Sequence, residues 1–254
     1  MALFKVREPY MPKIHIAIAT TAVLVATITI SHAEDVSNTT NFLGWNGKLE
    51  FGYNAASGNS NTSNLKLDGE ARRDWRDWAL NLEGKARYAK SEEVRSEENY
   101  KFGLQTDRKL NDIEYVFGAI DYEVDNFSGY DYRATETVGY GRKLYEGGKQ
   151  KLVAQLGAGI RQSKAEDENT ETDFLLKPEA NYSYRLNDHV TFTQMGRGSI
   201  GAEYGVYESE TALKSKLVEN MYLKASYTVK YTTDVPSDRK NTDTLTGISV
   251  GYTF

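Results

Sequence analysis

The stretch "TDTLTGISVGYTF" (242–254), with which the chain ends, decides the fold. Thr246, Ile248, Val250, Tyr252 and Phe254 occupy every second position, and this period of two is typical of a β-strand with one apolar face. Chain ends that lie in water are usually polar and frayed. An aromatic residue at the last position therefore predicts a final strand whose apolar face is covered to its end.

The same alternation recurs along most of the chain. In the stretch 64–73, Leu65 and Leu67 alternate with Lys66 and Asp68. The composition agrees, because 18 tyrosines, 21 glycines and only four prolines in 254 residues favour strands and turns. The expected strands are 45–55, 64–73, 78–88, 98–108, 113–124, 133–143, 151–162, 173–185, 190–196, 207–217, 222–232 and 243–254. The sequence predicts an all-β fold of about twelve strands.

Two expected strands are uncertain, because the phase of 113–124 is ambiguous and 190–196 is short and partly polar; a proline marks a third. In 113–124, Val116, Ile120 and Tyr122 compete with Tyr115 and Phe117 for the apolar face. In 173–185, Pro178 cannot donate a hydrogen bond to a neighbouring strand, which predicts a bulge or an end of pairing there.

Short and long connections alternate between these strands. The short turns are 72–77, 108–112, 142–148, 184–189 and 215–220; the longer polar connections are 56–63, 89–97, 125–132, 163–172, 197–204 and 233–242. This asymmetry is typical of up-and-down membrane barrels, which have tight periplasmic turns and longer outside loops. The sequence therefore predicts a transmembrane antiparallel β-barrel.

Aromatic residues support this orientation. Those expected near the periplasmic ends are Trp45, Trp75, Trp78, Tyr140, Tyr184, Tyr222, Tyr252 and Phe254; those expected near the outside ends are Tyr53, Tyr88, Tyr100, Tyr122 and Tyr231. Such rings fit the two depths at which lipid meets water. The alternative explanation of this placement is that β-strands are generally enriched in aromatic residues.

A secretory leader precedes the expected barrel. Basic residues are followed by the apolar run 16–30 and then by "SHA", in which Ser31 and Ala33 are the small residues of a cleavage site. The run is shorter than the roughly 20 residues that span a bilayer. We expect a signal peptide over 1–33, cleavage between Ala33 and Glu34, a short periplasmic segment over 34–44 and the barrel over 45–254. The start codon, Met1 or Met11, is left open.

Charge and cysteine content exclude several partners. The leader holds three basic residues and one acidic, so the chain from Glu34 onward carries a net charge of −7. Nucleic acid is therefore not an expected partner. The absence of cysteine excludes disulfides, thiolate metal sites and a lipidated cysteine. We expect no cofactor.

The polar face of each strand gives the candidate lumen. Its charged positions are Lys48, Glu50, Lys66, Asp68, Glu70, Arg72, Glu83, Lys85, Arg87, Lys101, Asp107, Arg161, Lys177, Glu179, Lys214 and Lys216. Opposite charges on neighbouring strands can pair. Two interpretations remain: a salt-bridged filling that stabilises a narrow barrel, or a small pore whose charges select solutes. A twelve-strand barrel is intermediate in width, so size does not decide between them.

The last strand also indicates how the sheet closes. An open edge in lipid leaves backbone groups unpaired, so the final strand must pair with the first. Ile248, Val250, Tyr252 and Phe254 resemble the carboxy-terminal assembly signal of bacterial outer-membrane barrels. That resemblance implies recognition by the barrel-assembly machinery, with outer-membrane lipid as the other partner.

A wider resemblance extends over the chain after the leader. It rests on "SGNSNTSNL" (57–65), "NFSGYDYRATETVGYG" (126–141), "LGAG" (156–159), "DT" near 240–244 and the last strand. These segments are similar to a domain-of-unknown-function family described as salt-induced outer-membrane proteins. The resemblance implies a bacterial outer-membrane barrel without an established activity, and it assigns no catalytic residue.

Three apparent sites are interpreted as structural. "GRGSIG" (196–201) has the glycine spacing of a nucleotide-binding loop, but no helix is expected after it. The acidic loop 165–173 has Thr172 where a calcium loop needs glycine. His189, the only histidine after the leader, lies in an expected turn beside Asp188. We expect no catalytic, cofactor-binding or metal residue, and therefore no enzyme.

Three functions follow in order of preference. The first is a structural barrel of the envelope related to salt stress, the second a narrow channel for small hydrophilic solutes or ions, and the third an outer-membrane enzyme. The solute, the inducing condition and the oligomeric state are left open.

Overall fold

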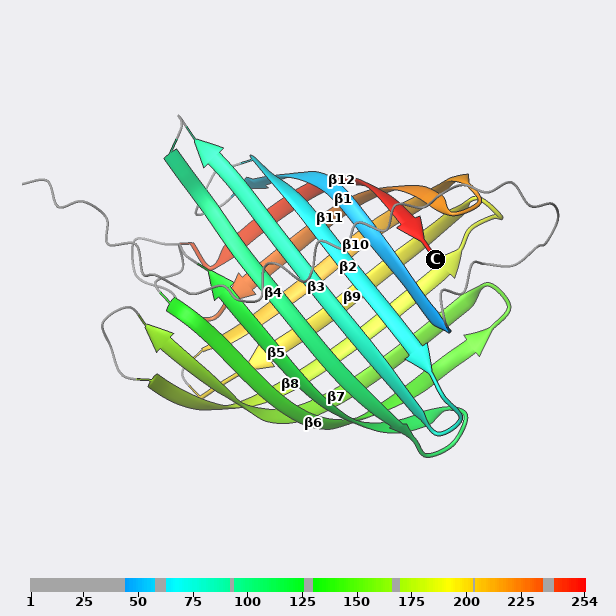
Figure 1. Ribbon diagram of the computed structural model, residues 1–254, viewed down its shortest axis with the longest axis horizontal. Coiled ribbons are helices and arrows are strands. Elements are labelled where there is room, and N and C mark those ends of the chain that lie inside the picture. The colour runs from blue at the N-terminus through cyan, green and yellow to red at the C-terminus, as the bar shows by residue number, and fades with distance from the viewer. Residues whose placement is uncertain are drawn as a thin grey trace, which may run out of the picture. The chain divides into compact units, whose positions relative to one another are not determined.

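The fold is a closed barrel of twelve antiparallel strands. The structure, a computed structural model, describes residues 44–57, 63–91, 94–125, 130–165, 170–202, 204–234 and 240–254. The expected leader, its cleavage site and all of 34–44 except Gly44 lie outside these residues. The strands are β1 (Trp45–Ser57), β2 (Ser63–Asp74), β3 (Trp78–Ser91), β4 (Val94–Lys109), β5 (Glu114–Asp125), β6 (Tyr130–Gly147), β7 (Gln150–Ala165), β8 (Thr170–Arg185), β9 (Val190–Ile200), β10 (Gly205–Val218), β11 (Met221–Thr232) and β12 (Thr242–Thr253). Each pairs with its neighbours in the chain, and β12 returns to β1 (Figure 1).

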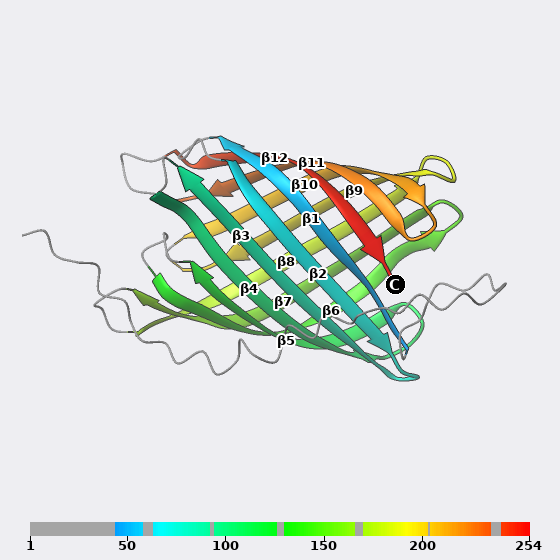
Figure 2. The same cartoon turned by 45° about the horizontal axis from the view of Figure 1, so that its top comes forward.

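Closure depends on the register of the first and last strands. Lys48 lies opposite Thr253 and Ser57 opposite Thr244, and the pairing between them is continuous. Beyond the strand, Gly47 and Phe254 exchange two backbone hydrogen bonds of 2.9 and 3.0 Å. The prediction that the last strand closes the barrel is confirmed. The tilted strands wrap around the barrel in both views (Figures 1 and 2).

The barrel has two rims. One, called here the turn rim, carries the chain end at Phe254 and the connections 75–77, 110–113, 148–149, 186–189 and 219–220. The far rim is formed by the opposite ends of the strands, between which the chain runs through 58–62, 92–93, 126–129, 166–169, 201–204 and 233–241. In Figure 1 the turn rim lies to the right, where the C-terminus is marked.

All twelve expected strands are present, but several run further than expected. The stretch 89–97 was expected to be a connection, whereas β3 continues to Ser91 and β4 begins at Val94. Backbone pairing there extends beyond the stretch of alternating apolar residues, and Ala89 still lies opposite Glu97. Pairing needs only backbone groups, so the hydrogen-bonded ladder can extend beyond the alternating side chains from which a strand is predicted. The difference in length between the two sets of connections is therefore smaller than the sequence indicates.

The uncertain strands are now defined. The short expected strand 190–196 is β9 and continues to Ile200. In β5, Val116 and Ile120 are exposed on the outer face, whereas Phe117 is buried on the inner face with 7% exposure. Between β8 and β9, Leu176 pairs with Ile200 and Glu179 pairs with Arg197, and the two pairs between them are missing. The missing pairs lie at Pro178, and the register is the same on both sides. The proline therefore interrupts the pairing without producing a bulge.

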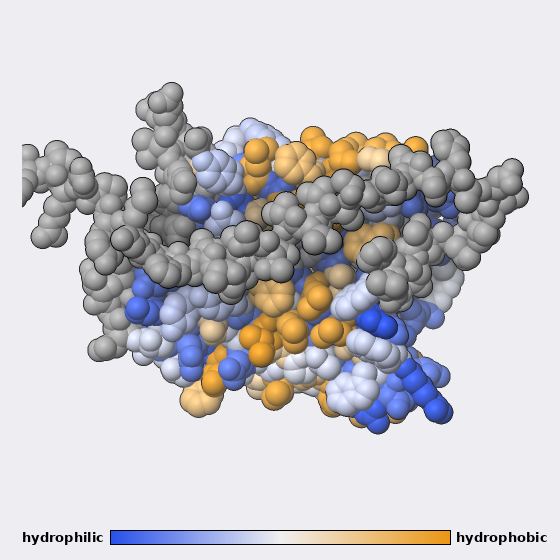
Figure 3. All heavy atoms as spheres, in the orientation of Figure 1, coloured by the Kyte–Doolittle hydropathy of each residue, from blue (hydrophilic) through white to orange (hydrophobic). Residues whose placement is uncertain are grey.

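The outer surface of the barrel is apolar. Large side chains that point outward from the strands include Phe51, Leu67, Phe102, Ile120, Val138, Leu156 and Ile248, all at least half exposed. Figure 3 shows apolar side chains gathered over the strands and hydrophilic side chains at the ends of the visible face. Such a surface is unfavourable in water, and it fits a surrounding apolar medium. The described residues form no helix long and apolar enough to cross a membrane.

Aromatic residues follow the expected two bands with one exception. Trp75, Trp78 and Tyr252 are exposed on the outer face near the turn rim. Tyr222 was expected to join them, but it is 9% exposed and its hydroxyl donates a hydrogen bond to Glu50. Tyr222 pairs with Gly251, the neighbour of Tyr252 in the chain, and so lies on the opposite face of the sheet. Its assignment to the outer band was wrong.

Several aromatic rings lie against glycines of the next strand. A Cβ added to Gly141 would lie 2.1 Å from Cζ of Tyr115, and one added to Gly251 would lie 2.2 Å from Cζ of Tyr222. The absence of a side chain at these glycines lets each ring lie flat on the inner wall. This arrangement keeps these two rings close to the wall.

Candidate functional site

The candidate site is the inner wall of the barrel. Residues opposite one another in an antiparallel pair share a face of the sheet, so the register identifies which side chains point inward. Starting from Glu50, the pairs with Asp68 and Gly251 extend the inner face to β2 and β12. The same procedure continues around the barrel.

Glu50 is the centre of the first network on this wall. Its carboxylate accepts a hydrogen bond of 2.6 Å from Tyr222 and lies 3.4 Å from Nζ of Lys224. Nζ of Lys214 is 3.8 Å away and Nζ of Lys66 is 4.0 Å away. Lys214 is on β10, three strands from β1 in the order of the sheet, so this contact crosses the interior. Glu50 is 2% exposed, and its charge is compensated by these neighbours.

A second network joins β2, β3 and β4 near the turn rim. Arg72 contacts Asp74 at 2.8 Å and Asp107 at 3.1 Å. Asn81, on the strand between them, accepts a hydrogen bond of 2.7 Å from Arg72 and donates one of 3.1 Å to Asp107. Gln105 donates to Asp107 as well. Oδ2 of Asp107 thus has donors from β2 and β3, and its Oδ1 has a donor from Gln105 on β4 itself.

A third group of ion pairs lies on the remaining strands. Asp121 on β5 contacts Lys177 on β8 at 2.6 Å, which spans three steps of the sheet, and Lys101 on β4 at 3.7 Å. Arg197 and Glu208 pair at 2.8 Å between β9 and β10. Most of these ion pairs join adjacent strands and lie along the wall.

The structure places all of the sequence-derived lumen candidates on the inner face. Lys48, Glu50, Lys66, Asp68 and Glu70, on β1 and β2, lie in or beside the Glu50 network, which Lys214 also contacts, and Arg72 and Asp107 belong to the second network. Among the other ion pairs, Lys101 and Lys177 share Asp121, Glu83 pairs with Lys85, and Arg161 pairs with Asp173 at 2.7 Å. Glu179 accepts a hydrogen bond from Asn181, and Arg87 and Lys216 lie opposite the inward-facing Lys66 and Tyr222 in the register. They belong to one continuous surface.

Sequence reasoning missed other members of this surface. They are Tyr115, Phe117, Glu123, Arg197, Glu208, Glu210, Tyr222, Lys224 and Lys230. The polar residues lie in strands whose alternation is clear only after the ends of the strand are known. The aromatic ones resemble outward-facing residues, because nothing in the local sequence indicates a glycine opposite each ring.

The wall leaves room for water. The side chains of Glu83 and Arg197 are each 29% exposed, and those of Lys177 and Lys48 are 28% and 27% exposed. These residues point inward, so the space that a water molecule reaches beside them is inside the barrel. A packed filling would bury them as completely as Glu50.

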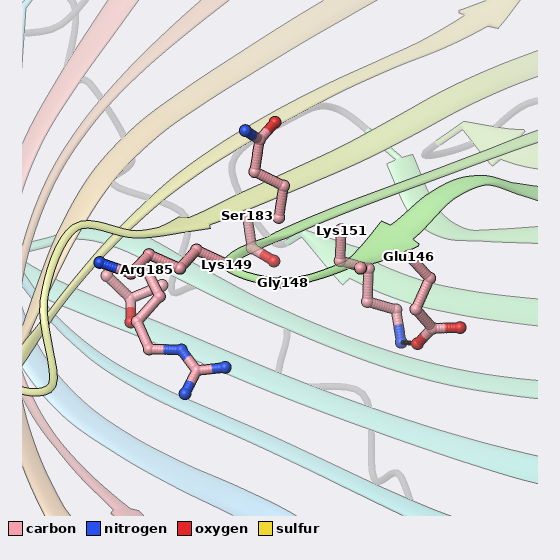
Figure 4. Close-up of a pocket in the computed structure, with 9 residues that line it drawn as sticks. Glu146, Gly148, Lys149, Lys151, Ser183 and Arg185 are labelled. Carbon is pink, nitrogen blue, oxygen red and sulfur yellow. Dashed lines mark ion pairs between the residues drawn. The ribbon is translucent and has the colours of Figure 1, made fainter.

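The wall opens at the turn rim into a depression of about 360 Å³. It is lined by the β6–β7 turn and by the ends of β8 and β9; Figure 4 shows Lys151 beside Glu146, and Lys149 and Arg185 together on the other side of Gly148. Glu146 contacts Lys151 and Lys143, each at 2.9 Å. The basic residues at this mouth therefore exceed the single acidic residue of its lining.

The other apparent sites have structural surroundings. Gly196 and Gly198 lie within β9, in the ladder with β10, and no helix follows them among the described residues. His189 lies in the 186–189 turn, where Oδ1 of Asn187 accepts hydrogen bonds from the backbone N–H groups of His189 and Val190. The acidic loop falls partly on 166–169, outside the described residues. Within the described ranges no three His, Asp or Glu side chains are grouped to hold a metal ion.

An antiparallel closed barrel with an apolar exterior and a charged, hydrated interior is the architecture of outer-membrane barrels. Two solved structures share this fold. The NanC porin in a rhombohedral crystal form matches with a TM-score of 0.56 and 14% identity, covering 80% of this chain and 98% of that one. The KdgM porin matches with a TM-score of 0.52 and 12% identity, covering 82% and 99%.

Sequence comparison identifies the family. The model described as "Protein of unknown function, DUF481" matches residues 49–254. Escherichia coli (strain K12) has a relative, "Uncharacterized protein YdiY", which is 34% identical to this chain over 209 residues. The match covers 82% of each of the two chains. The chain belongs to the DUF481 family.

Proposed function

We propose that this chain forms a narrow channel for small hydrophilic solutes in the bacterial outer membrane. The observation that carries the proposal is the partial exposure of inward charges such as Glu83, Arg197 and Lys177. Charged side chains keep water in a confined space, and a hydrated path is what a small polar solute requires. The likeness to structures named porins supports a channel, although at their identities it concerns the fold alone.

The position of the bulky side chains supports an open path. Tyr115 and Tyr222 lie over Gly141 and Gly251. Ion pairs such as Arg197 with Glu208 join adjacent strands, so these side chains lie along the wall. Both features keep these side chains near the wall, whereas Lys214 with Glu50 and Lys177 with Asp121 each span three steps of the sheet, so the proposed path is narrow. A structural barrel related to envelope stress is the second candidate, and the density of ion pairs on the wall favours it.

Location and assembly belong to the same proposal. A leader ending at Ala33 would export the chain, and its apolar exterior fits outer-membrane lipid. The final strand, from Ile248 to Phe254, would present the assembly signal. Cell fractionation tests this proposal: we expect the mature protein, beginning at Glu34, in the outer-membrane fraction. Recovery as a periplasmic protein would contradict it.

The experiment for the channel is conductance in planar bilayers. We expect the refolded barrel, checked by its heat-modifiable gel mobility, to give discrete single-channel steps in KCl. A series of neutral sugars of rising size, added to the bath, should reduce the steps until the sugars no longer enter. A folded barrel that inserts into bilayers and gives no steps would favour the structural barrel. No hydrolytic or transfer activity is proposed.

A further inference from the structure

One row of inward positions carries basic side chains and no acidic ones. The register runs from Arg185 on β8 through Thr191, Lys214, Lys224, Ser249 and Gly52 to Lys66 and Arg87 on β3. Every step of this path is a direct pair in the sheet, and every member points inward. We call Arg185, Lys214, Lys224, Lys66 and Arg87 the basic row.

The basic row crosses the barrel from one mouth toward the other. Arg185 is the last residue of β8, next to the 186–189 turn at the turn rim. Arg87 lies in the half of β3 that leads to the far rim, because β3 starts at Trp78 beside the turn rim and ends at Ser91. The tilt of the strands turns a row that is straight in the sheet into a path along the barrel (Figure 1).

The middle and the ends of the row differ in their partners. The three lysines contact acidic residues: Lys224 lies 2.8 Å from Glu210, and Glu50 is shared by all three at 3.4 to 4.0 Å. Arg185 and Arg87 make no ion pair with any acidic residue in the described part of the chain. Nε of Arg87 is buried, and no described residue forms a hydrogen bond with it.

The turn-rim end continues into the depression described above. Lys149 and Lys151 lie with Arg185 around it (Figure 4), and Glu146, the acidic residue of its lining, is engaged by Lys151 and Lys143. A solute at this mouth meets positive charge first, and low-dielectric walls strengthen that field. Guanidinium groups bind the oxygens of carboxylates and phosphates in pairs.

We propose that the basic row guides small oxyanions, which carry a carboxylate or a phosphate, through the barrel. The proposal names the solute class of the channel and so rests on the proposed function. Lys and Arg side chains that line a path favour anions, as in other anion-selective pores. The middle lysines are partly neutralised by Glu50 and Glu210, so the anion is held weakly enough to leave.

The test is the reversal potential of single channels in a KCl gradient. The wild-type barrel should favour chloride over potassium. The double substitution Arg185→Gln and Arg87→Gln should lower the anion-to-cation permeability ratio by about twofold or more, because two charges that act on the path at short range are removed. Neither change leaves a carboxylate without its partner. Replacing chloride by acetate or by phosphate then distinguishes the two solute chemistries, and permeation of either supports the proposal.

The matched control is Arg142→Gln. Arg142 is near the same rim but on the outer face, 3.7 Å from Glu114, and its loss should leave the ratio unchanged. Cation selectivity of the wild-type channel, or an unchanged ratio in the double variant, would overturn the proposal and leave the channel intact. A folded barrel without any current would instead contradict the proposed function. If the double variant does not fold, each arginine is replaced singly, and the wild-type selectivity remains decisive.

Discussion

Phe254 and Gly47 join the last strand of the barrel to the first: the N–H of each residue donates a hydrogen bond to the C=O of the other. The ring of Phe254 also lies over Gly47, because a Cβ at position 47 would be 2.4 Å from Cζ of the ring. The last residue of the chain thus takes part in closure through its backbone and its side chain. This contact connects the predicted assembly signal with the geometry of the seam.

The first prediction concerns this seam. Deletion of Phe254 and Phe254→Ala should both lower the amount of folded barrel, whereas Phe254→Trp should be tolerated because a ring remains. Gly47→Ala should act in the same direction, since its Cβ would also lie 2.6 Å from the backbone oxygen of Glu70, and overpacking costs about 1–3 kcal/mol. Heat-modifiable mobility of membrane fractions measures the folded species. Wild-type amounts after deletion of Phe254 would show that the end of the chain is dispensable.

The second prediction concerns Glu50. Glu50→Gln leaves Lys66 and Lys224 without their shared carboxylate in a buried site, and we expect a loss of about 3–5 kcal/mol in the free energy of unfolding. The matched control is Glu70→Gln, because Glu70 pairs with Lys48 but its side chain is 48% exposed. There the expected loss is about 1 kcal/mol or less. Urea unfolding in lipid vesicles measures both, and equal losses would refute the role of Glu50.

The third prediction concerns the glycines under the aromatic rings. Gly141→Ala should push Tyr115 away from the wall and lower the single-channel conductance, because the three atoms nearest to the added Cβ all belong to the Tyr115 side chain. Gly84 has no atom within 4 Å of such a Cβ, so Gly84→Ala is the control and should conduct as the wild type does. Conductance that is the same in both variants would show that the ring does not limit the path.

The sequence predicted the architecture well because a membrane barrel repeats one simple rule. Alternation depends only on the two faces of a strand, so all twelve strands could be placed, and Glu50 and Lys66 could be assigned to the inner face. The positions of individual partners could not be predicted. That Glu50 meets Lys214 depends on the register of three intervening pairs, which no local pattern contains. Tyr222 was misplaced for a related reason, since the glycine that accommodates its ring is 29 positions away at Gly251.

The fourth prediction concerns topology. The turn rim should face the periplasm and the far rim the outside of the cell, as in other outer-membrane barrels. An epitope tag inserted within 235–239 should be labelled on intact cells, whereas the same tag within 186–189 should be labelled only after lysis. Labelling of the 186–189 tag on intact cells would reverse the orientation.

The chain offers a direct way to examine the path because it contains no cysteine. Ala119 and Ile120 are adjacent on β5 and point to opposite faces: Ala119 pairs with inward-facing Gln105, and Ile120 is 53% exposed on the outside. Ala119→Cys therefore introduces one thiol into the lumen, and Ile120→Cys introduces one on the lipid-facing surface. The two variants differ only in the face that carries the thiol.

The single-channel current of the Ala119→Cys barrel, recorded before and after a charged, water-soluble thiol reagent is added, tests the central claim most directly. A channel through the barrel predicts that the reagent reacts with Cys at position 119 and reduces the current, while the Ile120→Cys barrel keeps its current. A folded Ala119→Cys barrel that carries no current, or one whose thiol reacts without any change in current, would contradict the claim that solutes pass through this lumen.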